Sequence, residues 1–376
     1  MKPIKINAFI FVWVLFLLSC NSQKKQNEQS FSPSDPKATK ETVEFFSTLE
    51  MRIDKGIMLG HQDDLAYGNK WYGESGRSDV KSVCGDYPAI FGWNVGNVEN
   101  GSLYNSDSVS FSKLAYYVKR VNKMGGVSTL TWLVHNPVTG GEYNDYSGNH
   151  VVKEILSGNS SHEKYLQYLD GLANFLNSLK DEKGRLIPVI FQPFHEHNIS
   201  GKYWWNTNQC TAEEFKKMWI MTVDYLRNKK DVHHILYAYS IHADTSSTAF
   251  ADYYPGNNYV DLIGVSLNLV QESDPSGKIY MQTLNRNLAV ICQFAEKNKK
   301  ISAVTDTGLE GVKISNYFSN YVYPIISQYK LSYIMFGRNA WDDENHYYIP
   351  IPGHPASEDF NGFSKSPKIL TCSKIQ

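Results

Sequence analysis

The chain has 376 residues, a length that suggests two domains, although a single α/β barrel with insertions also reaches it. Its 37 Lys and Arg nearly balance its 38 Asp and Glu, and the formal net charge of -1 excludes the basic surface expected of a nucleic-acid-binding protein. The 42% hydrophobic content supports a large core. The 25 Tyr, 18 Phe and 8 Trp fit either that core or a carbohydrate cleft, since sugar rings present apolar faces to aromatic planes.

The first 20 residues predict a signal for secretion through the inner membrane. Lys2 and Lys5 precede an apolar run over residues 8–18, which is too short to span a bilayer. The following Leu-Leu-Ser-Cys resembles the bacterial lipobox, which is cut before a Cys that is then lipidated; an ordinary signal peptide with a chance Cys is the alternative. We therefore expect Cys20 to anchor an outer-membrane lipoprotein on the periplasmic or cell-surface face.

The residues after the signal divide into a polar segment and one long domain. Residues 21–37 are rich in Ser, Gln, Lys and Asn, a composition that predicts a flexible tether, and residues 38–376 form the expected single domain. An exported protein can form disulfides, but the sequence does not choose a pairing among Cys84, Cys210, Cys292 and Cys372.

Short apolar runs then alternate with helical patterns along the chain. The runs are nearly continuous in apolar residues, as buried parallel strands are. The predicted strands cover residues 57–62, 88–93, 126–132, 187–196, 234–240, 260–266, 301–306 and 331–337.

The intervening helices are predicted from amphipathic spacing. The clearest begins at Thr211, which with Glu214 makes a T-x-x-E capping box. Further helices are expected over residues 109–124, 162–179, 280–297 and 314–329, with a loop-rich tail over residues 347–376. Eight strand–helix units predict an α/β fold of the (β/α)8 TIM-barrel type. A doubly wound sheet is the alternative, weakened because no GxGxxG follows the first strand.

Polar and aromatic side chains follow the predicted strand ends, where the active sites of such barrels lie. Tyr203 and its two Trp neighbours fit a sugar platform or helix packing equally well. The candidate substrate-binding residues are His61, Trp132, His135, His195, Trp204, Trp205 and Arg338.

Two carboxylates end the fourth and seventh predicted strands, Glu196 and Asp306. Cleavage of a glycosidic bond needs two carboxyl groups flanking that bond, one to protonate the leaving oxygen and one to attack or to activate water. A loop cap or a surface ion pair is the alternative for either residue. The His195–His197 run lacks the H-E-x-x-H spacing, and we predict neither a metal nor another cofactor.

These motifs resemble glycoside hydrolase family 26, chiefly its β-1,4-mannanases and most closely those of Bacteroidetes. The resemblance spans residues 40–363, and rests on residues 60–64, 84–89, 193–197, 305–310, 338–340 and 352–354. It implies a retaining endo-β-1,4-mannanase that degrades β-mannan-type polysaccharide by double displacement. In that alignment Glu196 is the acid/base and Asp306 is the nucleophile.

The chain also departs from the family around the predicted site. Asp306 stands where the family usually has Glu, Asn268 where it has Tyr, and Gly337 where it has Trp. Gln192 replaces an Arg, and the Trp that normally follows the acid/base is replaced within residues 199–202. These changes leave a second hypothesis open, a catalytically impaired glycan-binding protein on the same barrel.

Overall fold

The computed structural model describes Met1 and residues 31–148, 150–244 and 249–376. The predicted signal peptide, Cys20 and most of the predicted tether lie outside these ranges. The end of the predicted tether does not behave as one, because Asp35 is buried and accepts a hydrogen bond from His233 Nδ1 at 2.7 Å. Within the described ranges, no helix combines the length and apolarity needed to cross a bilayer.

Parallel strands form a closed barrel, which confirms the predicted (β/α)8 fold. Neighbouring strands pair in chain order, and β10 pairs with β1, with Met58 opposite Tyr333, to close the ring. Within the described residues the eight barrel strands are β1 (Ile57–Gln62), β4 (Ile90–Asn94), β5 (Val127–Trp132), β6 (Val189–Pro193), β7 (Ile235–His242), β8 (Leu262–Asn268), β9 (Ile301–Gly308) and β10 (Tyr333–Phe336).

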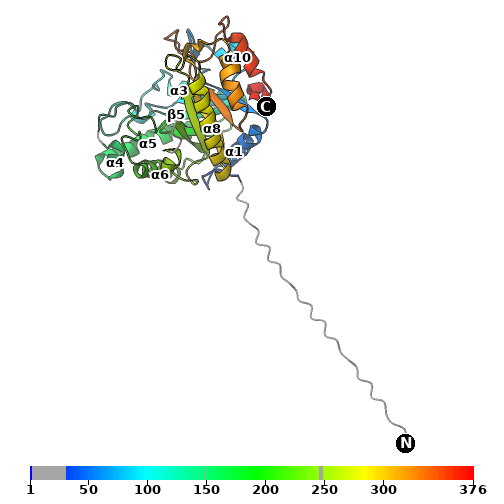
Figure 1. Ribbon diagram of the computed structural model, residues 1–376. Helices are drawn as coiled ribbons and strands as arrows, with labels where there is room; N and C mark the ends of the chain where they lie inside the picture. Colours follow the sequence, from blue (N-terminus) through cyan, green and yellow to red (C-terminus); the bar gives the residue numbers. More distant parts are fainter. Residues whose placement is uncertain (2–30, 149, 245–248) are drawn as a thin grey trace. The chain divides into compact units, whose positions relative to one another are not determined.

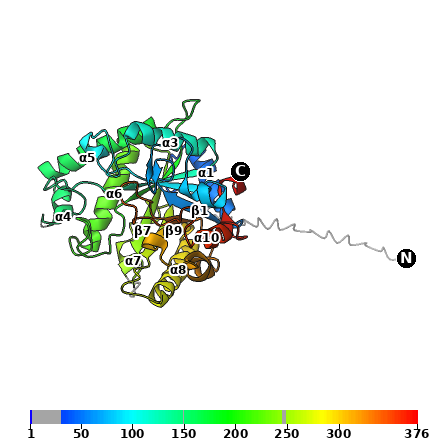
Figure 2. The ribbon, with the colours of Figure 1, turned by 90° about the horizontal axis from the view of Figure 1, so that it is seen from above.

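Helices surround the strands in the view along the barrel (Figure 2). The predicted capping box at Thr211 and Glu214 opens α6, and the predicted helix over residues 162–179 begins two residues early. The helices are α1 (Lys40–Ile53), α2 (Asp79–Cys84), α3 (Phe111–Lys123), α4 (Val151–Leu156), α5 (Ser160–Ser178), α6 (Ala212–Asn228), α7 (Ala249–Tyr253), α8 (Lys278–Asn298), α9 (Tyr323–Ile326) and α10 (Ser357–Ser364).

The barrel interior forms its own core, closed at one end by α1. Inward-facing strand residues such as Met58, Ile90 and Leu236 cluster with Phe46 and Leu49 of α1. A larger core lies between the strands and the outer helices. Because α1 covers the end at which the strands begin, the opposite end, where they finish, is left open for a site.

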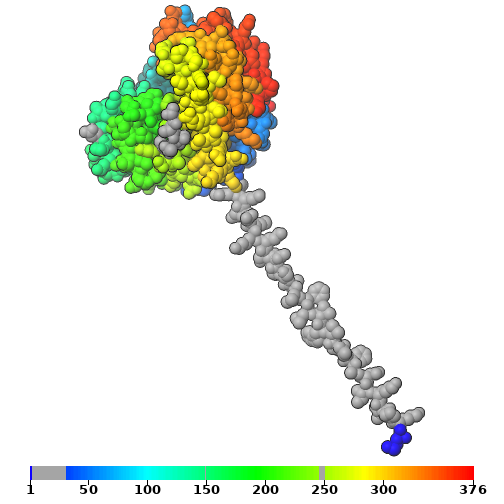
Figure 3. Space-filling view, in the orientation of Figure 1, coloured from blue at the N-terminus to red at the C-terminus, as the bar shows by residue number. Residues whose placement is uncertain are grey.

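Two predictions for the C-terminal part need correction. The expected helix over residues 314–329 is a π-helical turn, Phe318–Val322, followed by α9, because Pro324 lacks the N–H that a continuous helix needs. The tail is less loop-rich than expected, since it contains α10 and a strand, β11 (Ile369–Leu370), parallel to β1. Figures 1 and 3 show the red C-terminal segment beside the orange part of the chain, where Phe360 meets Phe318 at a ring-centroid distance of 4.8 Å.

Smaller elements complete the fold. A two-stranded antiparallel hairpin, β2 (Tyr67–Gly68) and β3 (Trp71–Tyr72), follows β1. Short 3-10 turns occur at Val98–Asn100, Glu310–Val312 and Cys372–Lys374.

The cysteines at positions 84, 210, 292 and 372 are free thiols in the described part of the chain, so none of the possible disulfide pairings is formed there.

Candidate active site

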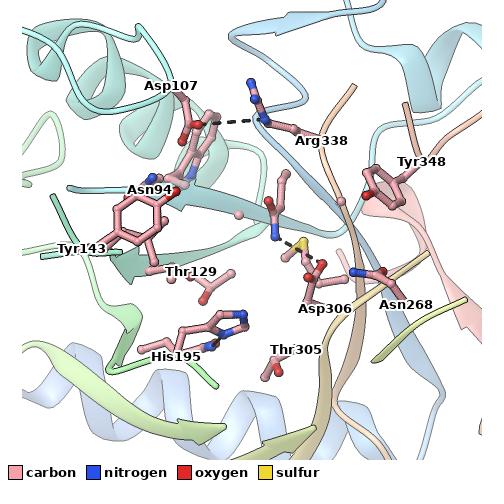
Figure 4. Close-up of a pocket in the computed structure, with 18 of the residues that line it drawn as sticks. Asn94, Asp107, Thr129, Tyr143, His195, Asn268, Thr305, Asp306, Arg338 and Tyr348 are labelled. Atoms are coloured by element: carbon pink, nitrogen blue, oxygen red, sulfur yellow. Dashed lines mark hydrogen bonds and ion pairs between the residues drawn. The ribbon is translucent and has the colours of Figure 1, made fainter. Parts of the chain in front are cut away.

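A cavity of about 300 Å³ opens at the carboxyl ends of the barrel strands (Figure 4). Every barrel strand except β7 contributes to its walls through a residue in or just after the strand, and loop residues complete the rim. The polar and aromatic lining residues are Gln62, Trp93, Asn94, Asp107, Thr129, Thr131, Tyr143, Gln192, His195, Lys202, Tyr203, Asn268, Thr305, Asp306, Arg338, His346 and Tyr348.

The chain turns sharply after β6, and this turn places Glu196. Phe194 and Glu196 both adopt positive φ, 51° and 50°, a conformation that is uncommon for residues other than glycine. In this turn His195 lies in the cavity wall. His197 is instead fully buried against Phe215, with 4.5 Å between the ring centroids. Glu196 itself is 3% exposed, lying just behind the cavity lining.

Both oxygens of the Glu196 carboxylate have partners. Ser266 Oγ donates to Oε1 at 2.6 Å, and the Lys202 ammonium contacts Oε2 at 2.7 Å. His195 Nε2 lies 3.4 Å from Oε2, and His242 Nδ1 lies 3.4 Å from Oε1. Burial raises the pKa of Glu196, but His195, His242 and Lys202 together outweigh it and hold that pKa well below its usual range.

Asp306 faces Glu196 from β9. One oxygen of each carboxylate and one ring nitrogen of His195 all lie within 4.8 Å of one another. Gln62 Nε2 is 3.5 Å from Asp306 Oδ1, the contact drawn as a dashed line beside Asp306 in Figure 4. Burial raises the pKa of Asp306 to about 6, while the charges of His195 and Lys202 and a hydrogen bond from Asn268 oppose a larger rise.

The same three side chains are the candidates for holding a cation among the described residues. They do not fit one well, because the Lys202 ammonium already occupies one side of the Glu196 carboxylate and would repel a second positive charge. The arrangement suits proton transfer and nucleophilic attack instead: Asp306 lines the cavity, Glu196 lies directly behind the lining and close to Asp306, and their environments push their pKa values in opposite directions.

The structure brings four of the predicted site residues together, Glu196, Asp306, His195 and Arg338. Asp306, His195 and Arg338 line the cavity, and Glu196 lies directly behind it. Arg338 Nε is 3.9 Å from Asp107 Oδ1 on the wall opposite His195, as Figure 4 shows.

Three other predicted substrate-binding residues, His61, Trp132 and His135, do not line the cavity. His61 is fully buried, with its Nδ1 2.7 Å from Asp64 Oδ1. Trp132 is also buried, and Trp132 Nε1 and the His135 backbone N–H both donate to the carboxylate of Glu99, at 3.0 and 2.9 Å. His61 and Trp132 are therefore held behind the cavity wall, and the side chain of His135, 16% exposed, is fixed by Glu99.

Trp204 and Trp205 are likewise buried, which decides between the two interpretations of this aromatic run in favour of packing. Both rings meet the Phe194 ring edge-on, at centroid distances of 6.3 and 6.0 Å. Trp205 Nε1 donates to the His195 carbonyl at 3.0 Å. The two indoles therefore hold the strained turn in place. Tyr203, stacked on Trp205 at 4.7 Å, does line the cavity.

Several lining residues were not predicted from the sequence. Asp107 and Tyr143 come from loops after β4 and β5, and Tyr348 comes from the segment predicted as a tail. The residues near 107 offered only a short polar run before a helix, and Tyr348 lies far from any strand end in the chain. No periodic pattern marks such positions.

The fold and the paired carboxylates define a barrel of the sugar-cleaving class, and comparison with known proteins gives its family. A model of glycosyl hydrolase family 26 matches residues 34–322, and the chain belongs to that family. A solved GH26 β-mannanase from Bacteroides ovatus is 40% identical, with a TM-score of 0.85 over 90% of this chain and 97% of that one. An endo-β-1,4-mannanase structure from Cellulomonas fimi is 29% identical, with a TM-score of 0.81 over 92% of this chain and 78% of that one.

Curated relatives agree with the structures. A mannan endo-1,4-β-mannosidase of Bifidobacterium adolescentis is 28% identical over 95% of this chain, which spans only 37% of that protein's length. A mannan endo-1,4-β-mannosidase of Bacillus subtilis is 23% identical, and the match covers 89% of each protein.

The burial of a neutral His197 in the turn after β6 can be tested by the pH dependence of stability. Burial lowers its pKa to about 3, so between that pH and about 6.5 the unfolded chain binds a proton that the folded protein does not. The stability that comes from keeping His197 neutral is therefore complete above pH 6.5 and is lost as the pH falls toward 3. In urea unfolding across pH 4–6, the free energy of unfolding of His197→Gln should fall less steeply than that of the parent, by about 1.4 kcal/mol per pH unit.

His234 is also buried, with its pKa lowered to about 4, but it is present in both proteins and its effect cancels in the comparison. Parallel slopes for the parent and the variant would show that His197 is protonated in the folded protein.

Proposed function

We propose that the protein is a retaining endo-β-1,4-mannanase, with Glu196 as acid/base and Asp306 as nucleophile. The observation that carries the proposal is the approach of the two carboxylates to within 4.8 Å at one cavity. Retaining glycosidases place their carboxyl groups about 5–5.5 Å apart, whereas inverting enzymes leave about 6.5–9.5 Å for a water molecule. The mannan substrate is supported by the named activity of the relatives.

In the proposed reaction Asp306 attacks the anomeric carbon as the bond to the leaving sugar breaks. Glu196 gives its proton to the leaving oxygen, and a glycosyl ester forms on Asp306. Glu196, now a carboxylate, then takes a proton from water, which displaces Asp306 and restores both groups. Arg338, Asp107 and Asn94 supply donors and acceptors for sugar hydroxyls on the opposite wall.

A reducing-end assay on linear mannan, glucomannan and galactomannan tests this function. The parent should release oligosaccharides, and Glu196→Gln and Asp306→Asn should each lower kcat by at least about 10³-fold, since neither amide can perform its carboxyl's step. Glu99→Gln is a control that changes another buried glutamate, behind the cavity wall. A parent that binds these polysaccharides without cleaving them would contradict the proposal and favour a glycan-binding role.

The protonation states of Glu196 and Asp306 give a second test, through the pH dependence of the reaction. The reaction needs one proton on Glu196 and none on Asp306, yet the pKa of Glu196 is held low and that of Asp306 is raised to about 6. The pair should therefore be singly protonated between its two apparent pKa values, and kcat/KM should be bell-shaped with its basic limb near pH 6.

Lys202→Met should move both limbs of this profile to higher pH, because the ammonium stabilises the charged form of both carboxylates. Lys330→Met is the matched control, since Lys330 also contacts a carboxylate, Asp54 at 2.9 Å, but on the solvent-exposed surface away from the cavity. Limbs that stay in place in Lys202→Met would show that the ammonium does not set the ionisation of the pair.

We further propose that the enzyme is a lipoprotein of the Bacteroidetes type, anchored through Cys20 to the outer membrane on its periplasmic or outer face. The lipobox-like residues 17–20 and the basic and apolar residues before them support this. Labelled fatty acid fed to expressing bacteria should enter the parent and not Cys20→Ser. Surface proteolysis of intact cells then distinguishes the two faces, and an unlabelled parent recovered in the medium would contradict the anchor.

A further inference from the structure

A pair of exposed aromatic side chains lies on the rim of the barrel, outside the cavity. Tyr72 ends the β2–β3 hairpin and Trp341 follows Arg338 by three residues. Their ring centroids are 5.3 Å apart with the planes at 63°, and they are 38% and 40% exposed. Single exposed aromatics are common on protein surfaces, but two in contact beside a cavity are typical of a binding surface.

One buried carboxylate holds this pair in place. Asp79, at the start of α2, accepts hydrogen bonds from the Asn69 backbone N–H at 2.8 Å, from Trp71 Nε1 at 2.7 Å and from Asn339 Nδ2 at 2.8 Å. The first two partners belong to the hairpin that carries Tyr72, and Asn339 lies two residues before Trp341. The Asp79 carboxylate thus holds both of the segments that carry the two rings. Because these segments are already ordered, binding a ligand there costs little conformational entropy.

A line of contacts connects the pair to the cavity wall. Arg338 Nη1 donates to Tyr67 Oη at 3.3 Å, and the Tyr67 ring lies 6.2 Å from the Tyr72 ring with the planes nearly parallel, at 8°. Tyr72 Oη donates to the carbonyl of Ser108, the residue after Asp107, at 2.6 Å. Arg338 and Asp107, paired in Figure 4, are thus linked to Tyr72, Arg338 through Tyr67 and Asp107 through the neighbouring Ser108 carbonyl.

We propose that Tyr72 and Trp341 form an outer subsite for a further sugar ring of the glycan held in the cavity. This inference rests on the proposed function, because an enzyme that cuts within a polymer must let the chain leave its cavity along the surface. Sugar rings offer apolar faces to indole and phenol rings, and the rim next to Arg338 and Asp107 provides both aromatic rings. A site of this kind adds affinity for long chains and none for chains that end inside the cavity.

Hydrolysis of manno-oligosaccharides of increasing length tests the subsite. Trp341→Ala and Tyr72→Ala should lower kcat/KM for the longest chains about tenfold, mainly through KM, and leave the shortest hydrolysed chain within about twofold. Tyr116→Ala is the matched control, because Tyr116 on α3 is 54% exposed and meets Tyr117 at 5.6 Å and 61°, outside the cavity. A uniform loss at every length, or variants that match Tyr116→Ala, would overturn the subsite.

Gel retardation of the full chain separates this inference from the proposed activity. The gels contain galactomannan, glucomannan, xylan or a cellulose derivative. If the parent cleaves no mannan but is retarded by one of these glycans and Trp341→Ala is not, the subsite stands and the mannanase proposal fails. If the parent cleaves mannan and Trp341→Ala is retarded as strongly as the parent, the subsite fails and the mannanase proposal stands. A parent that neither cleaves nor is retarded overturns both.

Discussion

The site depends on the strained turn that follows β6. Phe194 and Glu196 both adopt positive φ, which costs on the order of 1–3 kcal/mol for each residue that has a side chain. The surrounding core opposes that cost: Phe194 is enclosed by Trp204, Trp205 and other rings, and Trp205 donates to the His195 carbonyl. An extended backbone would send His195 and Glu196 to opposite faces, as in any strand. The turn instead brings both toward Asp306 and leaves His197 in the core.

The loop that begins with this turn also sets the charge of the site. Lys202 lies only six residues after Glu196 and reaches back to its carboxylate. Burial raises the pKa of both carboxyl groups, and the charges of His195 and Lys202 lower both. At Glu196 the lowering contributions outweigh burial and at Asp306 they do not, so the two pKa values separate and the pair has one proton to share. At Glu196 the largest contribution that opposes burial comes from His195, and Lys202, in the segment where the family resemblance places a Trp, adds to it.

The sequence predicted those parts of the fold that repeat and those parts of the site that lie at strand ends. Apolar runs mark barrel strands wherever they occur, and a barrel brings their ends to one mouth, so Glu196 and Asp306 could be expected to meet. Apolar runs do not predict which way a side chain points beyond the end of a strand. Trp204 and Trp205 have the composition of a sugar platform but face the core. Asp107 and Tyr348 reach the cavity from loops whose path depends on tertiary contacts.

Tyr348 also changes the meaning of one departure from the family. Gly337 stands where a Trp is usual, and it is one of the departures that left an impaired glycan-binding protein open as a second hypothesis. In the structure the Tyr348 ring lies over this glycine, and a Cβ there would come within 2.8 Å of the ring; Gly308 leaves room on its other side. The backbone N–H of Tyr348 donates to Asn339 Oδ1 at 2.9 Å, which fixes the ring beside Asp306 and Asn268 (Figure 4). An aromatic wall therefore persists at this place, supplied by a different segment, so the substitution reshapes the cavity and does not remove its wall.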